Sequence, residues 1–139
     1  MAEGYITARP FLYYRQTPFT LHSGKSSHWF VSGEAIFNDP YLKEEVLDCW
    51  TKALPDTYKV PHFFGIPSGG TPWAEAIAEY TYGIVLTDPT SLTPETYLVD
   101  DVTTTGQSFR AYGSTLPRLV VVNRGDVPVL SSWLSLSLA

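Results

Sequence analysis

Short apolar runs alternate with helical patterns from Val60 onward, and this alternation restricts the fold more than any other feature of the chain. The apolar runs are VPHFFGI (60–66), GIVLTD (83–88), TYLVDDV (96–102) and RLVVVN (118–123), and the helical patterns cover 71–82 and the region near 107–112. The runs are too continuously apolar to leave one face in water, so they predict strands covered by helices on both faces. Strand–helix alternation further predicts a parallel twisted sheet with right-handed crossovers.

The first third of the chain has a different character. Residues 5–35 are rich in aromatic residues and threonine, and a turn at Ser23-Gly24-Lys25 separates FTLH from HWFV. Two such runs around a glycine-containing turn predict a β-hairpin.

The clearest helical pattern follows at residues 38–54. Asn38 or Asp39 can cap this helix, Pro40 suits its first position, and apolar residues recur at helical spacing as far as Leu54. We therefore expect a single α/β domain over residues 1–139. It would consist of a small β-rich N-terminal hood (1–37) and an α/β core (38–139).

Composition narrows the class of protein. The 139 residues, 44% of them hydrophobic, suffice for one core. Fourteen acidic against nine basic residues give a net charge of -5, which disfavours a nucleic-acid partner. The single cysteine, Cys49, forms no internal disulfide, and no Cys/His cluster has zinc-ligand spacing. Because we find neither a signal peptide nor a bilayer-length apolar run, we expect a cytoplasmic protein without a membrane partner.

Two adjacent carboxylates end the strand expected at TYLV. Asp100 and Asp101 lie at the carboxyl edge of the strand, and TTTGQS (103–108) follows at once. Such a turn can point backbone N–H groups and threonine hydroxyls into a concavity at a helix N-terminus, where a phosphate monoester fits. The neighbouring acids suit sugar hydroxyls or a divalent cation. The pattern therefore indicates a ribose 5-phosphate site, and a capped strand-to-helix turn is the alternative interpretation.

A second glycine-rich turn opens on the same edge of the expected sheet. The segment GIPSGGTP (65–72) follows the strand VPHFF and leads into a helix. Two anion-binding turns side by side suit a ligand with phosphates at both ends. Taken alone, this segment also fits a tight turn before a proline-started helix.

These segments resemble, in order, the type I phosphoribosyltransferases, and within them most closely orotate phosphoribosyltransferase. The matching segments are FTLHSGKSSHWFVS (19–32) for the substrate segment, GIPSGGTPWAEAIA (65–78) for the diphosphate loop and helix, YLVDDVTTTGQSFR (97–110) for the motif that binds 5-phosphoribosyl 1-diphosphate (PRPP), and RLVVVNRGDVPVLSSWLSL (118–136) for the final strands. The resemblance spans nearly the whole chain. It implies an enzyme of pyrimidine nucleotide metabolism that transfers ribose 5-phosphate from PRPP to orotate.

The resemblance also implies roles for individual residues. Asp100 and Asp101 would be the catalytic candidates and would hold the ribose. The PRPP-binding set would be His22, Lys25, Ser68, Gly69, Gly70, Asp100, Asp101, Val102, Thr103, Thr104, Thr105, Gly106, Gln107 and Ser108, and the base-binding set would be Phe30, Val31, Thr104 and Arg124. Magnesium would enter with PRPP, and its protein ligands are not identified. Core packing is the alternative for Phe30, and a solvated surface charge is the alternative for Arg124.

The chain departs from the family where positive charge is expected. His22 and Gly69 stand where the family carries lysines, with Lys25 where a second basic residue is usual. The segment LTDPTSLTPE (86–95) replaces a long loop rich in Lys, Arg and His, and no Lys or Arg occurs between Val60 and Phe109. Each preorganised donor lost typically raises the barrier by about 3 to 4 kcal/mol, so turnover should be slow unless other groups substitute. The candidate substitutes are His22, Lys25, Arg9 and Arg15.

These departures leave other functions open. One is a noncatalytic protein that binds PRPP or a nucleotide as a sensor or subunit, and another is a transferase for a different base. An RNA-binding attenuator on the same fold is disfavoured by the acidic charge. Family members usually pair, so the resemblance also implies a homodimer, although the loop that bridges their subunits is absent here.

Overall fold

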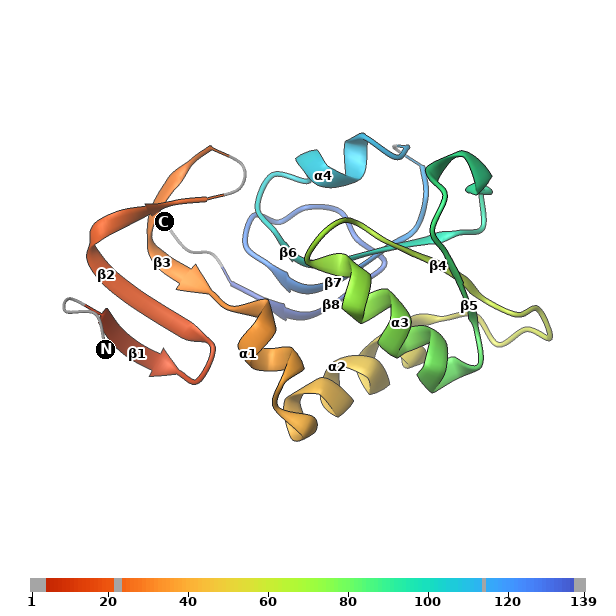
Figure 1. Cartoon of the computed structure of the whole chain (residues 1–139), viewed down its shortest axis with the longest axis horizontal. Helices are drawn as coiled ribbons and strands as arrows, with labels where there is room; N and C mark the ends of the chain where they lie inside the picture. The colour runs from red at the N-terminus through yellow and green to blue at the C-terminus, as the bar shows by residue number, and fades with distance from the viewer. Residues whose placement is uncertain (1–4, 22–23, 114, 137–139) are drawn as a thin grey trace.

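The structure is a computed structural model that describes residues 5–21, 24–113 and 115–136, and it contains two sheets (Figure 1). The first is an antiparallel sheet of β1 (Tyr5–Arg9), β2 (Leu12–Thr20) and β3 (Ser26–Val31), in that order. The hairpin expected in the N-terminal third is therefore present, with β1 as an additional strand. We call this sheet the hood.

The second sheet is parallel throughout, in the order β5-β4-β6-β7-β8. Its strands are β4 (His62–Gly65), β5 (Ile84–Leu86), β6 (Tyr97–Thr103), β7 (Arg118–Asn123) and β8 (Ser131–Ser135). The helices are α1 (Gly33–Phe37), α2 (Pro40–Ala53), α3 (Gly70–Thr81) and α4 (Gln107–Arg110), with a 3-10 helix η1 (Pro89–Ser91). This arrangement confirms the α/β fold expected from the alternation.

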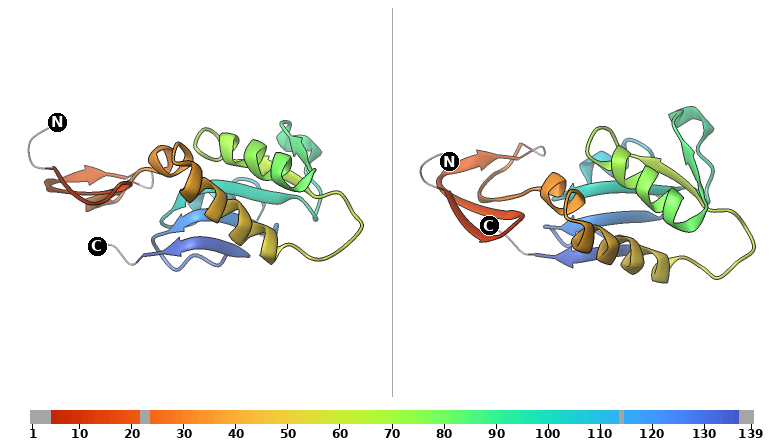
Figure 2. Two further views of the ribbon diagram at one scale, coloured as in Figure 1. Left: turned by 90° about the horizontal axis from the view of Figure 1, so that it is seen from below. Right: turned by 60° about the horizontal axis from the view of Figure 1, so that its bottom comes forward.

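One face of the parallel sheet is covered by α2 and α3, which lie side by side (Figure 2). The predicted cap of α2 is present, because Asp39 Oδ1 accepts hydrogen bonds from the amides of Tyr41 and Leu42. Trp50 of α2 is fully buried, and its Nε1 donates to the Val120 carbonyl at 3.0 Å. This helix is therefore held to the sheet by apolar burial and by one indole hydrogen bond.

The opposite face is covered by α4 and by loops. Phe109 of α4 is fully buried among Phe64, Leu98 and Val120, and side chains from the connecting loops pack around them. Both faces of the sheet are thus covered, as the continuous apolar runs predicted. No helix in the part of the chain that the structure describes is long and apolar enough to span a bilayer.

The third core strand, β6, extends beyond the TYLV segment at whose end the chain was expected to leave the sheet. Asp100 and Asp101 were expected where the chain leaves the sheet, but β6 continues to Thr103. The reason is its partner, because β7 pairs with β6 as far as Asn123 opposite Thr103. The two aspartates therefore lie in the last part of a hydrogen-bonded strand, where the ladder restrains their backbone.

The order of the strands reverses direction between β4 and β6. The chain leaves β4 through α3 toward β5 on one side, whereas it leaves β6 through α4 toward β7 on the other. Parallel sheets bind ligands at such a switch point, beyond the carboxyl ends of the strands. The hood lies beyond this same end of the sheet (Figure 1).

Gly70 allows the turn after β4 to approach β6 closely. A Cβ at this position would collide with the Val99 carbonyl oxygen and would lie 3.0 Å from the Asp100 Cα. Because the obstacle is backbone, the neighbouring strand cannot give way by a simple rotamer change.

We expect Gly70→Ala to destabilise the protein by about 2 kcal/mol or more, although alanine is the better helix former. The measurement is the free energy of unfolding from urea denaturation. Thr71→Ala is the matched control. Thr71 is the next residue of α3 and is exposed, so this substitution should change the free energy of unfolding little. Equal stability of the two variants would show that the close approach is not a constraint.

Candidate functional site

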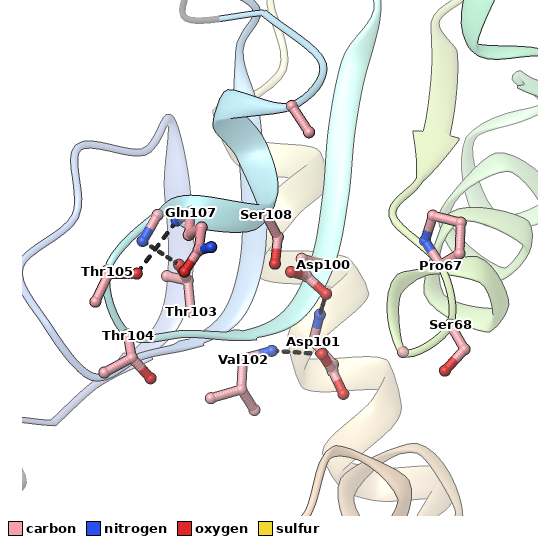
Figure 3. A pocket seen from close by; sticks show the side chains of 13 residues that line it. Pro67, Ser68, Asp100, Asp101, Val102, Thr103, Thr104, Thr105, Gln107 and Ser108 are labelled. Carbon is pink, nitrogen blue, oxygen red and sulfur yellow. Dashed lines mark hydrogen bonds between the residues drawn. The ribbon is translucent and has the colours of Figure 1, made fainter. Parts of the chain in front are cut away.

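A cavity of about 530 Å³ opens at the switch point between β4 and β6 (Figure 3). Its walls come from two segments, which we call the glycine turn (residues 67–70) and the aspartate–threonine loop (residues 100–108). The residues that line it are Pro67, Ser68, Gly69, Asp100, Asp101, Val102, Thr103, Thr104, Thr105, Gly106, Gln107, Ser108 and Ala111. The two segments singled out in the sequence therefore form one cavity. Beyond the predicted PRPP-binding residues the lining includes Pro67 and Ala111, whereas Gly70, which was predicted to bind PRPP, is not part of it.

The aspartate–threonine loop is shaped by its own threonines. Thr103 Oγ1 accepts a hydrogen bond from the Gly106 amide at 3.2 Å, and Thr105 Oγ1 accepts one from the Gln107 amide at 3.3 Å (Figure 3). Gly106 has a φ of 76°, a left-handed conformation that glycine adopts without strain. The threonines thus hold the loop in a tight turn, a role that the sequence pattern alone did not distinguish from ligand binding.

Hydrogen-bond donors remain available on this loop. Within the described residues, the amides of Thr104 and Thr105 donate to no acceptor, and the Thr103 hydroxyl, which accepts from an amide, donates to none. A hydroxyl that accepts one hydrogen bond can still donate another. Backbone and hydroxyl donors at the wall of a cavity are the groups that a phosphate monoester requires.

The two aspartates occupy different environments. Asp100 is only 6% exposed, and its Oδ1 accepts from the Asp101 amide at 2.8 Å. Asp101 accepts from the Val102 amide at 2.8 Å, and its carboxyl lies between Gly33 of α1 and Gly69 of the glycine turn. A side chain at Gly69 would collide with that carboxyl group. The absence of a side chain at Gly69 therefore leaves the space that Asp101 occupies.

Burial raises the pKa of Asp100 from 3.8 to about 8, and the neighbouring Asp101 carboxyl adds to the rise. At neutral pH, Asp100 is therefore protonated and can donate a hydrogen bond as well as accept one. Below pH 4 the group is protonated in the folded and the unfolded chain. Between pH 4 and pH 8 only the unfolded chain loses the proton, so folding loses stability as the pH rises.

We expect Asp100→Asn to remove this pH dependence. The stability of the wild type relative to the variant should fall by up to roughly 4 kcal/mol between pH 4.5 and pH 7.5, because one pKa unit corresponds to about 1.4 kcal/mol. Urea unfolding at both pH values measures it. Asp56→Asn, which changes an exposed carboxylate, should follow the wild type. A constant difference between wild type and Asp100→Asn would contradict the raised pKa.

The turn after β7 supports the aspartate–threonine loop, which the sequence reasoning did not anticipate. Asn123 Oδ1 accepts from the amides of Gly125 and Val127, and this turn places Val127 against Gly106. Gly125 passes so close to the Thr104 carbonyl that a Cβ would collide with it. The segment NRGD (123–126) has the composition of such a turn, so the turn itself could have been predicted from the sequence. The contact of this turn with the aspartate–threonine loop could not, because no sequence pattern indicates it.

The residues predicted to bind the base lie apart from the cavity, except Thr104. Val31 is buried in the core, and Phe30 is 42% exposed on the hood, with its ring centroid 5.4 Å from that of Phe19. Arg124 is 5% exposed, and its Nη2 donates to Ser27 Oγ at 3.0 Å and to the Trp29 carbonyl at 3.1 Å. Base binding by these residues stays a prediction.

Arg124 is an unusual buried cation. Its Nε has no hydrogen-bond partner within the described residues, and burial lowers its pKa. The guanidinium joins the end of β7 to β3 of the hood, so it is not the solvated surface charge that was the alternative. Of the basic PRPP candidates, His22 lies outside the described residues, and Lys25 is exposed and does not line the cavity.

The described residues contain no cluster of three or more His, Cys, Asp or Glu side chains that could hold a metal ion. The chemistry of the cavity is thus that of two carboxyl groups facing amide and hydroxyl donors. This donor set fits a metal ion that arrives already bound to a phosphorylated ligand, and magnesium in that form stays a prediction.

Comparison with known proteins gives a match at the level of structure. No protein-family model and no curated protein sequence matches the chain. Among solved structures, orotate phosphoribosyltransferase from Aeropyrum pernix matches with a TM-score of 0.64 at 24% identity over 85% of both chains. The chain has the type I phosphoribosyltransferase fold.

Two further structures show the breadth of this fold. Orotate phosphoribosyltransferase from Mycobacterium tuberculosis, in complex with inorganic phosphate, matches with a TM-score of 0.58 at 17% identity over 89% of both chains. Adenine phosphoribosyltransferase from Trypanosoma brucei, in complex with AMP, pyrophosphate and ribose 5-phosphate, has a TM-score of 0.54 at 16% identity, covering 69% of this chain and 58% of that one. The solved structures with this fold thus include transferases named for a pyrimidine, orotate, and for a purine, adenine.

Proposed function

We propose that this protein is a phosphoribosyltransferase of the orotate type, which transfers ribose 5-phosphate from magnesium-bound PRPP to a pyrimidine base. The observation that carries the proposal is one cavity at the switch point of the sheet, lined both by Thr104 and Thr105, whose amides are unengaged within the described residues, and by the carboxyl pair. The T. brucei relative was solved with ribose 5-phosphate and pyrophosphate, the two parts of PRPP. Both orotate-type relatives cover at least 85% of this chain.

We assign a part of PRPP to each wall of the cavity. The amides of Thr104 and Thr105 and the Thr103 hydroxyl would donate to the 5-phosphate. Asp100 and Asp101 would bond the ribose hydroxyls, and a protonated Asp100 would spare the diphosphate one negative neighbour. The glycine turn would lie along the diphosphate. Magnesium bound to PRPP would neutralise charge on that leaving group.

The reaction itself would be a displacement at the anomeric carbon. The bond from this carbon to the diphosphate oxygen breaks with its electron pair, and the lone pair of a ring nitrogen forms the new bond with inversion. The proton of the nitrogen passes to the departing diphosphate, and a nucleoside 5-monophosphate and diphosphate are released. The contribution of the chain is to orient the ribose, because holding reactants in line can supply a large part of the acceleration.

A second function is favoured by a specific observation. No Lys, Arg or His is among the described residues that line the cavity, so within this part of the chain the developing negative charge on diphosphate has no cationic side chain beside it. A noncatalytic protein that binds PRPP or a nucleotide as a sensor or subunit needs the ribose phosphate site and not this charge. Binding without turnover is its signature.

The test compares binding with turnover. Purified protein with magnesium, PRPP and orotate should form orotidine monophosphate, and calorimetry should show PRPP binding. Replacing both Asp100 and Asp101 with Asn should weaken PRPP binding by roughly 30-fold or more, since a hydrogen bond to a charged group is worth about 1.5 to 3 kcal/mol and one to a neutral group about 0.5 to 1.5 kcal/mol. The fold should persist, as judged by circular dichroism.

The outcomes separate the two candidate functions. Tight PRPP binding with no product from orotate, uracil or adenine would support the binding protein and overturn the transferase. Product from adenine alone would overturn the orotate assignment. No binding of PRPP by the wild type would overturn both.

We further expect Arg124→Ala to weaken orotate much more than PRPP, because a guanidinium can meet a polar edge of the base through several donors. Separate titrations of the two ligands measure this difference. Arg118→Ala, a change to the arginine at the other end of β7, is the control. Equal losses for both ligands in Arg124→Ala would instead assign the arginine to the attachment of the hood.

A further inference from the structure

Among the residues that the structure describes, the lining of the cavity has carboxyl groups and no cationic side chain. Thirteen of these residues form its wall; two of them are aspartates, and none is Lys, Arg or His. A phosphate monoester carries a charge of about −1.5 to −2 at pH 7, so it would enter this space against the local carboxyl groups. Within the described residues, a full positive charge near this ligand must therefore come from a side chain behind the wall.

Arg110 stands directly behind this wall. It is the last residue of α4, its side chain is exposed, and its Nη1 donates to the Thr105 carbonyl at 2.9 Å. The same nitrogen would lie 3.7 Å from a Cβ on Gly106. The guanidinium thus rests against the outer side of the aspartate–threonine loop and does not touch the cavity.

A continuous chain of hydrogen bonds leads from this guanidinium to the cavity. Arg110 donates to the Thr105 carbonyl, and the N–H of that same peptide unit, on Gly106, donates to Thr103 Oγ1 at 3.2 Å. The Thr103 hydroxyl lines the cavity and has no acceptor among the described residues. Each donor in such a chain polarises the next, so a charge at one end strengthens the donor at the other.

Other cations whose contacts the structure describes are engaged elsewhere. Arg118 lies over the Phe109 ring with its Cζ 5.0 Å from the ring centroid, and Lys43 lies over Phe37 at 4.2 Å. Arg124 bonds the hood, as described above. Arg110 is therefore the cation that these contacts join to the aspartate–threonine loop.

We propose that Arg110 is a positioning residue for the phosphate group of the ligand, acting through the Thr105–Gly106 peptide to polarise the Thr103 hydroxyl. This inference rests on the proposed function, because it assumes that a ribose 5-phosphate occupies the cavity. It accounts for part of the positive charge that the lining lacks. It requires no movement of the loop.

The test uses ribose 5-phosphate as the ligand. Arg110→Gln should weaken its binding by about 5- to 10-fold in calorimetry, because it removes a charge-assisted hydrogen bond and a nearby cation. In 31P NMR titrations, the pKa of the bound phosphate should be higher in the variant than in the wild type, since a cation favours the dianion. Arg110→Lys should keep the affinity and the pKa of the bound phosphate closer to the wild-type values than Arg110→Gln does. Lys59→Gln removes one exposed charge elsewhere and should change neither.

A double-mutant cycle tests the route through Thr103. Thr103→Val removes the hydroxyl, whereas Thr103→Ser keeps it. If Arg110 acts through this group, Arg110→Gln should change phosphate binding little in the Val background and fully in the Ser background. Equal effects in both backgrounds would overturn the inference.

The remaining outcomes are also decisive. Wild-type binding that Arg110→Gln leaves unchanged would overturn this inference and leave the proposed function standing. Weaker binding by Arg110→Gln and by Arg110→Lys, with an unchanged pKa of the bound phosphate, would show a purely structural role and would also overturn it. No binding of ribose 5-phosphate by the wild type would overturn the inference together with the proposed function.

Discussion

The parallel pairing of β6 with β4 on one side and β7 on the other is the interaction on which the site depends. It brings the carboxyl ends of two strands together at the point where the connections diverge. The glycine turn and the aspartate–threonine loop are about thirty residues apart along the chain, yet they meet across one cavity. Gly70 sets how closely they meet, because only hydrogen fits against the Val99 carbonyl.

The negative charge of the cavity is reduced by the burial of Asp100 and not by an ion pair with a cationic side chain of the described lining. Asp100 sits deep enough to keep its proton at neutral pH, which removes one negative charge from the place where a phosphorylated sugar would lie. Asp101 takes the space left by two glycines and keeps its carboxyl beside the cavity. This arrangement suits binding of a sugar better than stabilisation of a departing diphosphate, and it explains why a transferase and a binding protein are both reasonable proposals.

The hood is attached through few but well-defined contacts. Arg124 reaches from the end of β7 to Ser27 and the Trp29 carbonyl, and Phe11 packs against Trp133 of β8 with ring centroids 5.7 Å apart. A buried guanidinium with an unpartnered Nε is costly unless another group satisfies it. This contact lies between the hood and the core.

Local pattern was enough to predict β4, β5, β6 and β7, together with α2, α3, the hood hairpin and the two segments that form the cavity, whereas β8 was expected only from the family resemblance. Hydrophobic periodicity, helix caps and turn residues depend on residues that are close together in the sequence, so they can be recognised from the sequence alone. The extension of β6 to Thr103, the support of Gly106 by Val127, and the separation of Phe30 and Arg124 from the cavity were decided only by the tertiary structure. Each depends on pairing or packing between segments distant in the sequence, and no local preference encodes which distant backbone will lie alongside.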